Sequence, residues 1–283
     1  MRLYLLPIST RRTLLYCQKL QTLPSDKQSW ADWGTQRAAK LWAGWEQKES
    51  GWQKTVVRYG NKALRQIPYE EWGLKSVPTL STRRRQEEIL GKEKQQVVFP
   101  GSIISATHAP QILRTLATER ESLHRSRLVW CFVGMPISAP FALIPIIPNL
   151  PFFYLLYRAW SHYRAFAGGR HIQWLVSNNF LTLEPSSTLD TVYPNRLPSP
   201  TPVQPTSKSS SGPNPSDQTE KPSPVEEKML LTQASGRQLV KALDIPELEI
   251  EIERAIWQVE TDIQKQHESN KPSSDSDSAS EKK

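Results

Sequence analysis

The sequence has few of the residues that build small scaffolds or common active sites. Only two cysteines, Cys17 and Cys131, occur among 283 residues, which excludes a disulfide framework and a CxxC metal pair. Glycine is scarce, with 12 residues, and no GxGxxG, GxxxxGKS/T, HExxH or GxSxG string is present. The usual signatures of nucleotide binding, zinc hydrolysis and serine hydrolysis are therefore missing. We expect a protein that is not an enzyme and that uses neither a cofactor nor a metal ion.

Acidic residues are absent from one long part of the chain, since 62 residues between Glu121 and Glu184 include no Asp or Glu. Charge is also divided along the sequence. Residues 1–127 carry 22 Lys and Arg against 11 Asp and Glu, residues 128–196 carry 4 against 2, and residues 197–283 carry 10 against 15. A basic front, a nearly neutral middle and an acidic tail are typical of a protein anchored at its centre on an anionic surface. A nucleic-acid-binding protein would share only the basic front, and we expect no nucleic-acid partner.

Charged residues of either sign are absent from thirty consecutive positions, Leu128–Tyr157. About 20 residues of helix match a hydrocarbon core of about 30 Å, so a run of this length is typical of a membrane segment. Prolines, which disturb a helix, interrupt the run at Pro136, Pro140, Pro145, Pro148 and Pro151. We predict a mainly α-helical protein with a membrane-embedded, proline-broken helical hairpin that turns around Asn149. The alternative is the proline-rich core of a soluble helical domain.

The second half of this hairpin contains Arg158, His162 and Arg164, and Gly168-Gly169 is expected to end its helix. In an ion path, carbonyls freed by the prolines would supply oxygen ligands for potassium. Proton coupling would fall to His162, because the stretch contains no carboxylate. Arg158 lies on the same helical face, and its charge is expected to lower the pKa of His162. The other interpretation is an interfacial anchor whose basic side chains contact lipid headgroups such as those of cardiolipin.

The region before the run is basic and aromatic. Residues 1–25 contain four basic residues and no acidic one, a composition compatible with mitochondrial import. Between Ser29 and Ile67, tryptophans and basic residues recur at helical spacing, which predicts amphipathic helices. We therefore divide the first part of the chain into a basic, Trp-rich helical region (1–127) and the embedded segment with its flank (128–193).

Proline, serine and threonine dominate residues 194–228, which predicts a disordered linker. An acidic helical module is expected over residues 229–266 and a disordered tail over 267–283. The second helix of the module places apolar side chains on one stripe, formed by Leu248, Ile252, Ile256, Val259 and Ile263. Such a stripe needs a partner helix, either in the same chain or in another subunit.

Three separated blocks of sequence carry a resemblance to a known family. They are MRLYLLPISTRRTLLYCQ, PNLPFFYLLYRAWSHYRAFAGG and LTQASGRQLVKALDIPELEIEIERAIWQVE. Together they resemble the fungal mitochondrial potassium/proton exchange-related family, over roughly residues 1–264. The resemblance implies a protein of the mitochondrial inner membrane that takes part in the exchange of matrix potassium for protons and so in volume control.

The resemblance leaves the role of the chain within that process open. The chain is either a component of the exchanger, with potassium and protons as transported ions, or a regulator of it. The alternative is a non-transporting inner-membrane scaffold that recruits a separate transporter through the C-terminal helix. In each case we expect contact with inner-membrane lipids and, through the C-terminal helix, with a protein partner or a second copy of the chain.

Overall fold

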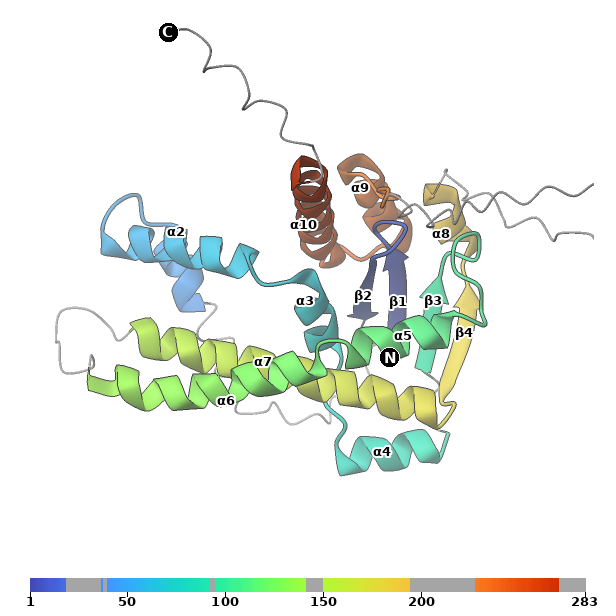
Figure 1. The fold of residues 1–283 in the computed structure, drawn as a ribbon, viewed down its shortest axis with the longest axis horizontal. Helices are drawn as coiled ribbons and strands as arrows, with labels where there is room; N and C mark the ends of the chain where they lie inside the picture. Colours follow the sequence, from blue (N-terminus) through green and yellow to red (C-terminus); the bar gives the residue numbers. More distant parts are fainter. Residues whose placement is uncertain (19–36, 38–39, 92–94, 141–149, 194–226, 270–283) are drawn as a thin grey trace, which may run out of the picture.

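A small mixed sheet with helices on both faces organises the protein (Figure 1). The computed structural model describes residues 1–18, 37, 40–91, 95–140, 150–193 and 227–269. In chain order the named elements are β1 (Arg2–Pro7), β2 (Thr13–Gln18), α2 (Trp52–Arg65), α3 (Tyr69–Ser76), α4 (Thr82–Ile89), β3 (Gln95–Phe99), α5 (Ala109–Thr118), α6 (Glu121–Ser138), α7 (Leu150–Ser177), β4 (Leu181–Pro185), α8 (Ser187–Val192), α9 (Gln233–Leu243) and α10 (Leu248–Ser269).

The sheet has the strand order β2-β1-β3-β4. Strands β1 and β2 form an antiparallel hairpin, in which Leu3 lies opposite Cys17 and Leu6 lies opposite Leu14. Strand β3 pairs in parallel with β1 on one side and with β4 on the other. The expectation of a helical N-terminal region is wrong at this point, since the first 18 residues contribute two strands.

Alternation along the strands divides the core into two clusters, because successive side chains of a strand point to opposite faces. Leu3 and Leu5 pack with buried residues of α3, α5 and α7. Tyr4 and Leu6 pack with buried residues of α8, α9 and α10. The helices therefore form a layer on each face of the sheet, and both faces of β1 are apolar for this reason.

Two glycines let α7 approach its neighbours closely. A Cβ atom on Gly168 would lie 2.1 Å from the carbonyl oxygen of Leu74 in α3, and one on Gly169 would lie 3.0 Å from that of Ala117 in α5. The sequence prediction that this glycine pair ends the helix is wrong, because α7 continues to Ser177. The glycines instead bring the backbone of α7 against α3 and α5.

Helices α6 and α7 lie side by side as a hairpin that extends from the sheet (Figure 1). Within the described ranges no helix is long and apolar enough to cross a membrane. The predicted membrane-embedded hairpin is therefore wrong. The physical reason is that each helix combines part of the uncharged run with a charged part: α6 includes Arg125 and Arg127, and α7 includes Arg158, Arg164 and Arg170.

The apolar stripe of the C-terminal helix finds its partner inside the same chain. Leu248, Ile252, Ile256 and Val259 are at most 1% exposed in the cluster that covers one face of β1, and Ile263 packs at its edge. Helix α9, which begins after a Thr232 capping box, lies against α10 in this layer. The stripe is thus part of the core of this fold.

This packing predicts unequal effects for two isoleucines of α10. Ile252→Ala should lower the free energy of unfolding by about 2–4 kcal/mol, because it opens a cavity in a closely packed layer. Ile250 is 65% exposed in the same helix, so Ile250→Ala should change the free energy of unfolding by less than about 0.5 kcal/mol. Urea unfolding at two protein concentrations measures both values. Equal losses, or a loss that disappears on dilution, would contradict intrachain packing of the stripe.

Candidate functional site

A buried polar cluster lies where α3, α6 and α7 meet. Its members come from all three helices: Glu71 and Lys75 from α3, His124 from α6, and Arg158, Ser161 and His162 from α7. Each of these residues is at most 8% exposed. Burying charge costs free energy unless the charges are paired and hydrogen-bonded, so the contacts inside the cluster decide whether α7 can pack on α3.

Glu71 is the centre of the cluster. Its carboxylate accepts two hydrogen bonds from the Arg158 guanidinium, at 2.9 and 3.2 Å. The Ser161 hydroxyl donates a further hydrogen bond to the same carboxylate, at 2.6 Å. This two-pronged geometry suits a planar guanidinium and fixes the distance between α3 and α7.

The second nitrogen of Arg158 also reaches His162, and this contact fixes where the imidazole protons lie. The guanidinium Nη2 is 3.0 Å from His162 Nε2, which must accept because an arginine only donates. His162 therefore carries its proton on Nδ1, which lies 3.1 Å from Nδ1 of His124. His124 accepts there and carries its own proton on Nε2, which is buried without a hydrogen-bond partner among the described residues. Arg158, His162 and His124 thus form a directed chain of hydrogen bonds.

Burial has the largest effect on the pKa values of the two imidazoles. It lowers the pKa of both His162 and His124, the nearby Glu71 carboxylate opposes this, and the charge of Arg158 lowers both values further. Burial alone would raise the pKa of Glu71, but the Ser161 hydrogen bond and the charge of Arg158 bring it below its usual value. At neutral pH the cluster therefore holds an ionised carboxylate, a guanidinium and two neutral imidazoles.

Lys75 adds a second buried cation to the cluster. Its ammonium donates to the Tyr157 hydroxyl at 3.3 Å and to the Ser161 hydroxyl at 3.2 Å. It also faces three aromatic rings, with its nitrogen 3.5 Å from the ring centre of Trp72 and 5.3 Å from those of Tyr157 and Trp160. Burial lowers the pKa of Lys75 to about 8, although the charge of Glu71 raises it. Lys75 is therefore a buried group whose charge changes near neutral pH.

The donor set of Glu71, His124 and His162 was tested as a metal site. One ligand atom from each residue lies within 4.8 Å of the others, and two imidazoles with a carboxylate are ligands that zinc accepts. However, the Arg158 contact places the proton of His162 on Nδ1, the atom that faces the other two groups. The guanidinium also occupies both oxygens of Glu71. The arrangement fits a hydrogen-bonded cluster and does not fit a metal ion.

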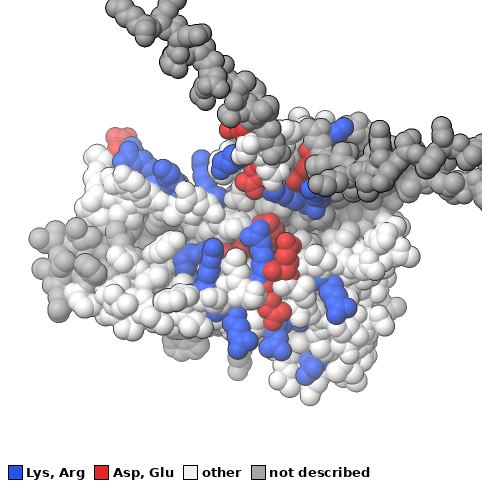
Figure 2. All heavy atoms as spheres, viewed as in Figure 1, with Lys and Arg blue, Asp and Glu red and all other residues white. Residues whose placement is uncertain are grey.

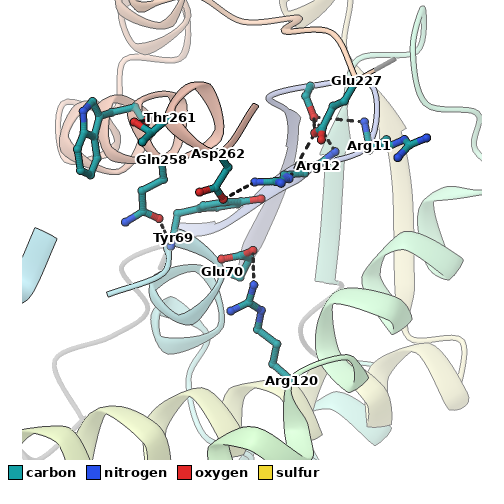
Figure 3. Close-up of polar contacts among 11 residues, drawn as sticks. Arg11, Arg12, Tyr69, Glu70, Arg120, Glu227, Gln258, Thr261 and Asp262 are labelled. Carbon is teal, nitrogen blue, oxygen red and sulfur yellow. Dashed lines mark hydrogen bonds and ion pairs between the residues drawn. The ribbon is translucent and has the colours of Figure 1, made fainter. Parts of the chain in front are cut away.

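A cleft of about 980 Å³ lies on the surface where the β1–β2 turn, the start of α3, α5 and α10 meet. Arg12 pairs in it with Asp262 at 2.8 Å and with Glu227 at 3.3 Å, and Arg120 pairs with Glu70 at 2.9 Å. Figure 3 shows these pairs beside Tyr69. The Arg12 pairs join the C-terminal segments to the N-terminal hairpin, and the Arg120 pair joins α3 to the start of α6. The cleft therefore contains charges of both signs that pair with one another.

Comparison with known proteins identifies the family. The family described as mitochondrial K+-H+ exchange-related matches residues 2–176. The chain belongs to the mitochondrial K+-H+ exchange-related family. The matched region contains every residue of the buried cluster.

Two fungal relatives are themselves uncharacterized proteins. One, from Schizosaccharomyces pombe, is 29% identical over 193 residues, which cover 67% of this chain and 81% of the relative. The other, from Saccharomyces cerevisiae, is 24% identical over 203 residues, which cover 63% of each chain. No solved structure matches the chain. Membership of the K+-H+ exchange-related family thus establishes a mitochondrial association and a relation to this exchange.

The structure separates the residues that the sequence analysis grouped in one hairpin. Arg158 and His162 are buried in the cluster, and Arg164 is half-buried, with its guanidinium donating to the carbonyl of Lys75 at 3.4 Å. Pro136 lies inside α6, Pro151 lies in the first turn of α7, and Pro140 follows α6; all three are exposed. Pro145, Pro148 and Asn149 lie outside the described residues.

Four members of the cluster were not predicted from the sequence, namely Glu71, Lys75, His124 and Ser161. Glu71 lies 87 positions before Arg158, so spacing along the chain gave no indication of their contact. The expected effect of Arg158 on the pKa of His162 has the predicted direction, but burial contributes more. The carboxylate that the uncharged run lacks is supplied by another helix.

Removing the central carboxylate should destabilise the protein strongly. Glu71→Gln leaves the buried Arg158 guanidinium without a counter-charge, and breaking such a pair costs about 3–5 kcal/mol. The neighbouring Glu70→Gln is the matched control, because the Glu70–Arg120 pair is partly exposed and contributes about 0–1 kcal/mol. Denaturant unfolding measures both. Similar losses for the two variants would contradict the central role of Glu71.

The imidazole pair predicts a loss of stability on acidification. A histidine with a lowered pKa binds protons more readily in the unfolded state, so stability falls as pH drops below the ordinary value of 6.5. The expected slope is about 1.4 kcal/mol per pH unit for each imidazole. Unfolding curves between pH 7 and 5 should show a shallower slope for His162→Gln than for the wild type. An unchanged slope for His162→Gln would count against the assigned protonation.

Proposed function

We propose that this protein regulates K+-H+ exchange at the mitochondrial inner membrane, without enzymatic activity, and that the buried cluster makes its conformation respond to protons. The single observation that carries the proposal is that the contact between α3 and α7 is made by titratable groups, in a chain of a family related to this exchange. Lys75 and Arg158 both bridge these two helices. A change in charge there alters how firmly α7 is held.

The direction of the response follows from the Lys75 environment. A lysine whose pKa is lowered by burial is disfavoured in its charged form, so proton uptake weakens the packing around it. His162 behaves in the same sense, because its protonated Nε2 would place a second donor against the Arg158 guanidinium. Each bound proton therefore loosens the attachment of α7 to α3 and α6.

Other charged groups act on the same cluster from the surrounding helices. Besides Glu71 and Arg158, Lys75 feels Glu251 and Arg254 of α10. Besides Glu71 and Arg158, the charge of Arg127 within α6 lowers the pKa of both imidazoles, and Arg120, before α6, lowers that of His124. Arginine stays charged at any relevant pH. Lys75, with a pKa of about 8, therefore changes charge near the neutral range.

A scaffold that recruits a separate transporter through the C-terminal stripe has less support. Those side chains fill the core between α10 and the sheet, so exposing them to a partner would open the fold. A regulator that acts through α6 and α7 leaves that core intact. We therefore favour regulation over recruitment by the C-terminal helix.

The proposal predicts that Lys75→Met abolishes a proton response. Mitochondria from cells lacking this chain, supplied with the wild type or the variant, are tested for swelling in potassium acetate between pH 7 and 9. A shift of the Lys75 pKa to about 8 is equivalent to up to about tenfold in a conformational equilibrium over this range. We expect the pH dependence of the exchange rate to flatten with Lys75→Met and to persist with Lys241→Met, at an exposed position of α9. Exchange that is unaffected by loss of the chain would overturn the proposed function.

A second readout checks the fold of the variant. Because the charged ammonium is disfavoured, Lys75→Met should keep or raise the stability at pH 7, in contrast to Glu71→Gln. Wild-type stability should rise by about 1.4 kcal/mol between pH 7 and 9 through Lys75, and the variant should lack this rise. An identical pH profile for both would contradict titration of Lys75.

A further inference from the structure

The outer halves of α6 and α7 expose an unusual amount of apolar surface. We call residues 128–140 and 150–163 the arm. Nine of the sixteen large hydrophobic side chains that are exposed among the described residues lie on it, each 47–70% exposed: Val129, Trp130, Phe132, Val133, Ile137, Phe153, Tyr154, Leu156 and Tyr163. Within the α6 part, only Cys131 and Ser138 are buried. Concentrations of this kind mark interaction surfaces.

The exposed charged side chains next to the arm within α6 and α7 are basic. No Asp or Glu occurs between Glu121 and Glu184, while Arg125 and Arg127 are exposed in α6 next to the apolar part and Arg170 is exposed further along α7. Figure 2 shows the projecting side of the molecule as mostly white, with blue and red side chains near its base. Electrostatic complementarity favours a partner surface of negative charge. An apolar face flanked by exposed arginines complements an anionic surface.

The side-chain types also match a lipid interface. Trp130, Tyr154 and Tyr163 combine an apolar ring with a polar group, which favours the boundary between headgroups and acyl chains. The exposed stretch Val129–Ile137 measures only about 12 Å along its helix, against about 30 Å for a hydrocarbon core. Two neighbouring helices with exposed apolar sides can instead lie in the plane of a leaflet, with these side chains about 5–10 Å deep.

We propose that the arm docks on an anionic phospholipid surface, lying in its plane without crossing it. The inference rests on the proposed action at the inner membrane and names the part of the molecule that makes this contact. The buried cluster joins the arm to α3 through Arg158 and Ser161. Proton uptake that loosens this joint would thus change how the docked arm is held relative to the sheet.

Flotation of the purified full chain with vesicles tests the inference. The vesicles contain phosphatidylcholine alone or phosphatidylcholine with cardiolipin. The wild type should float with the cardiolipin vesicles, and the triple variant Trp130→Ser, Phe132→Ser and Ile137→Ser should bind at least about tenfold more weakly. The matched control replaces Ile89, Leu90 and Ile250 with Ser, since these are 58–68% exposed outside the arm, and should bind as the wild type does.

A double variant, Arg125→Gln with Arg127→Gln, separately tests the contribution of the basic side chains to vesicle binding. This pair should reduce the preference for cardiolipin vesicles, and added salt should reduce wild-type binding in the same way. All substitutions are at exposed positions, and circular dichroism checks that each variant is folded. Any of three results would overturn the inference. They are absence of wild-type flotation, equal loss of binding in both triple variants, and an arm that mediates only self-association in gel filtration. The pH response of Lys75→Met mitochondria is a separate readout, so the arm and the regulatory role can fail independently.

Discussion

The ion pair between Glu71 and Arg158 is the constraint on which the arrangement of the helices depends. An arginine cannot lose its proton, so a buried Arg158 requires a carboxylate within reach. The stretch from residue 122 to 183 contains none, and α3 supplies it across 87 positions of sequence. The close approach of α7 to α3 that this demands is possible because Gly168 has no side chain at the contact with Leu74.

The same pair sets the chemistry of its neighbours. Because one guanidinium donates both to Glu71 and to His162, the first imidazole is held neutral with a defined proton, and this fixes the second. Lys75 then places a second cation beside a carboxylate that is already neutralised. The cluster has one more positive charge than negative, and it stays buried because aromatic rings and hydroxyl groups surround the ammonium. A further positive charge is therefore strongly disfavoured in this buried site.

Sequence reasoning succeeded where local signals decide the structure and failed where distant residues do. Helices α9 and α10 lie within the predicted helical module, and the periodic stripe indicated the buried face of α10. The strands β1 and β2 were missed, because short apolar runs such as RLYLLP fit a buried strand and a helix equally well. The length of the uncharged run was overvalued, since the structure joins its ends to charged residues within the same helices. Glu71 and His124 could not have been paired with His162 from spacing alone.

Helix α7 shows why a single segment produced both a membrane prediction and a buried polar site. Its first half is apolar on exposed sides, and its second half packs between α3 and α5 with Arg158 and His162 at the junction. A hydropathy average over the segment combines these two environments. Helix α7 packs on its own domain at one end and exposes apolar side chains at the other. Because a packed helix moves as a rigid body, a change at the junction is transmitted along its length. In the proposed regulation, the polar cluster at that junction therefore connects proton binding inside the protein to the surface of the arm.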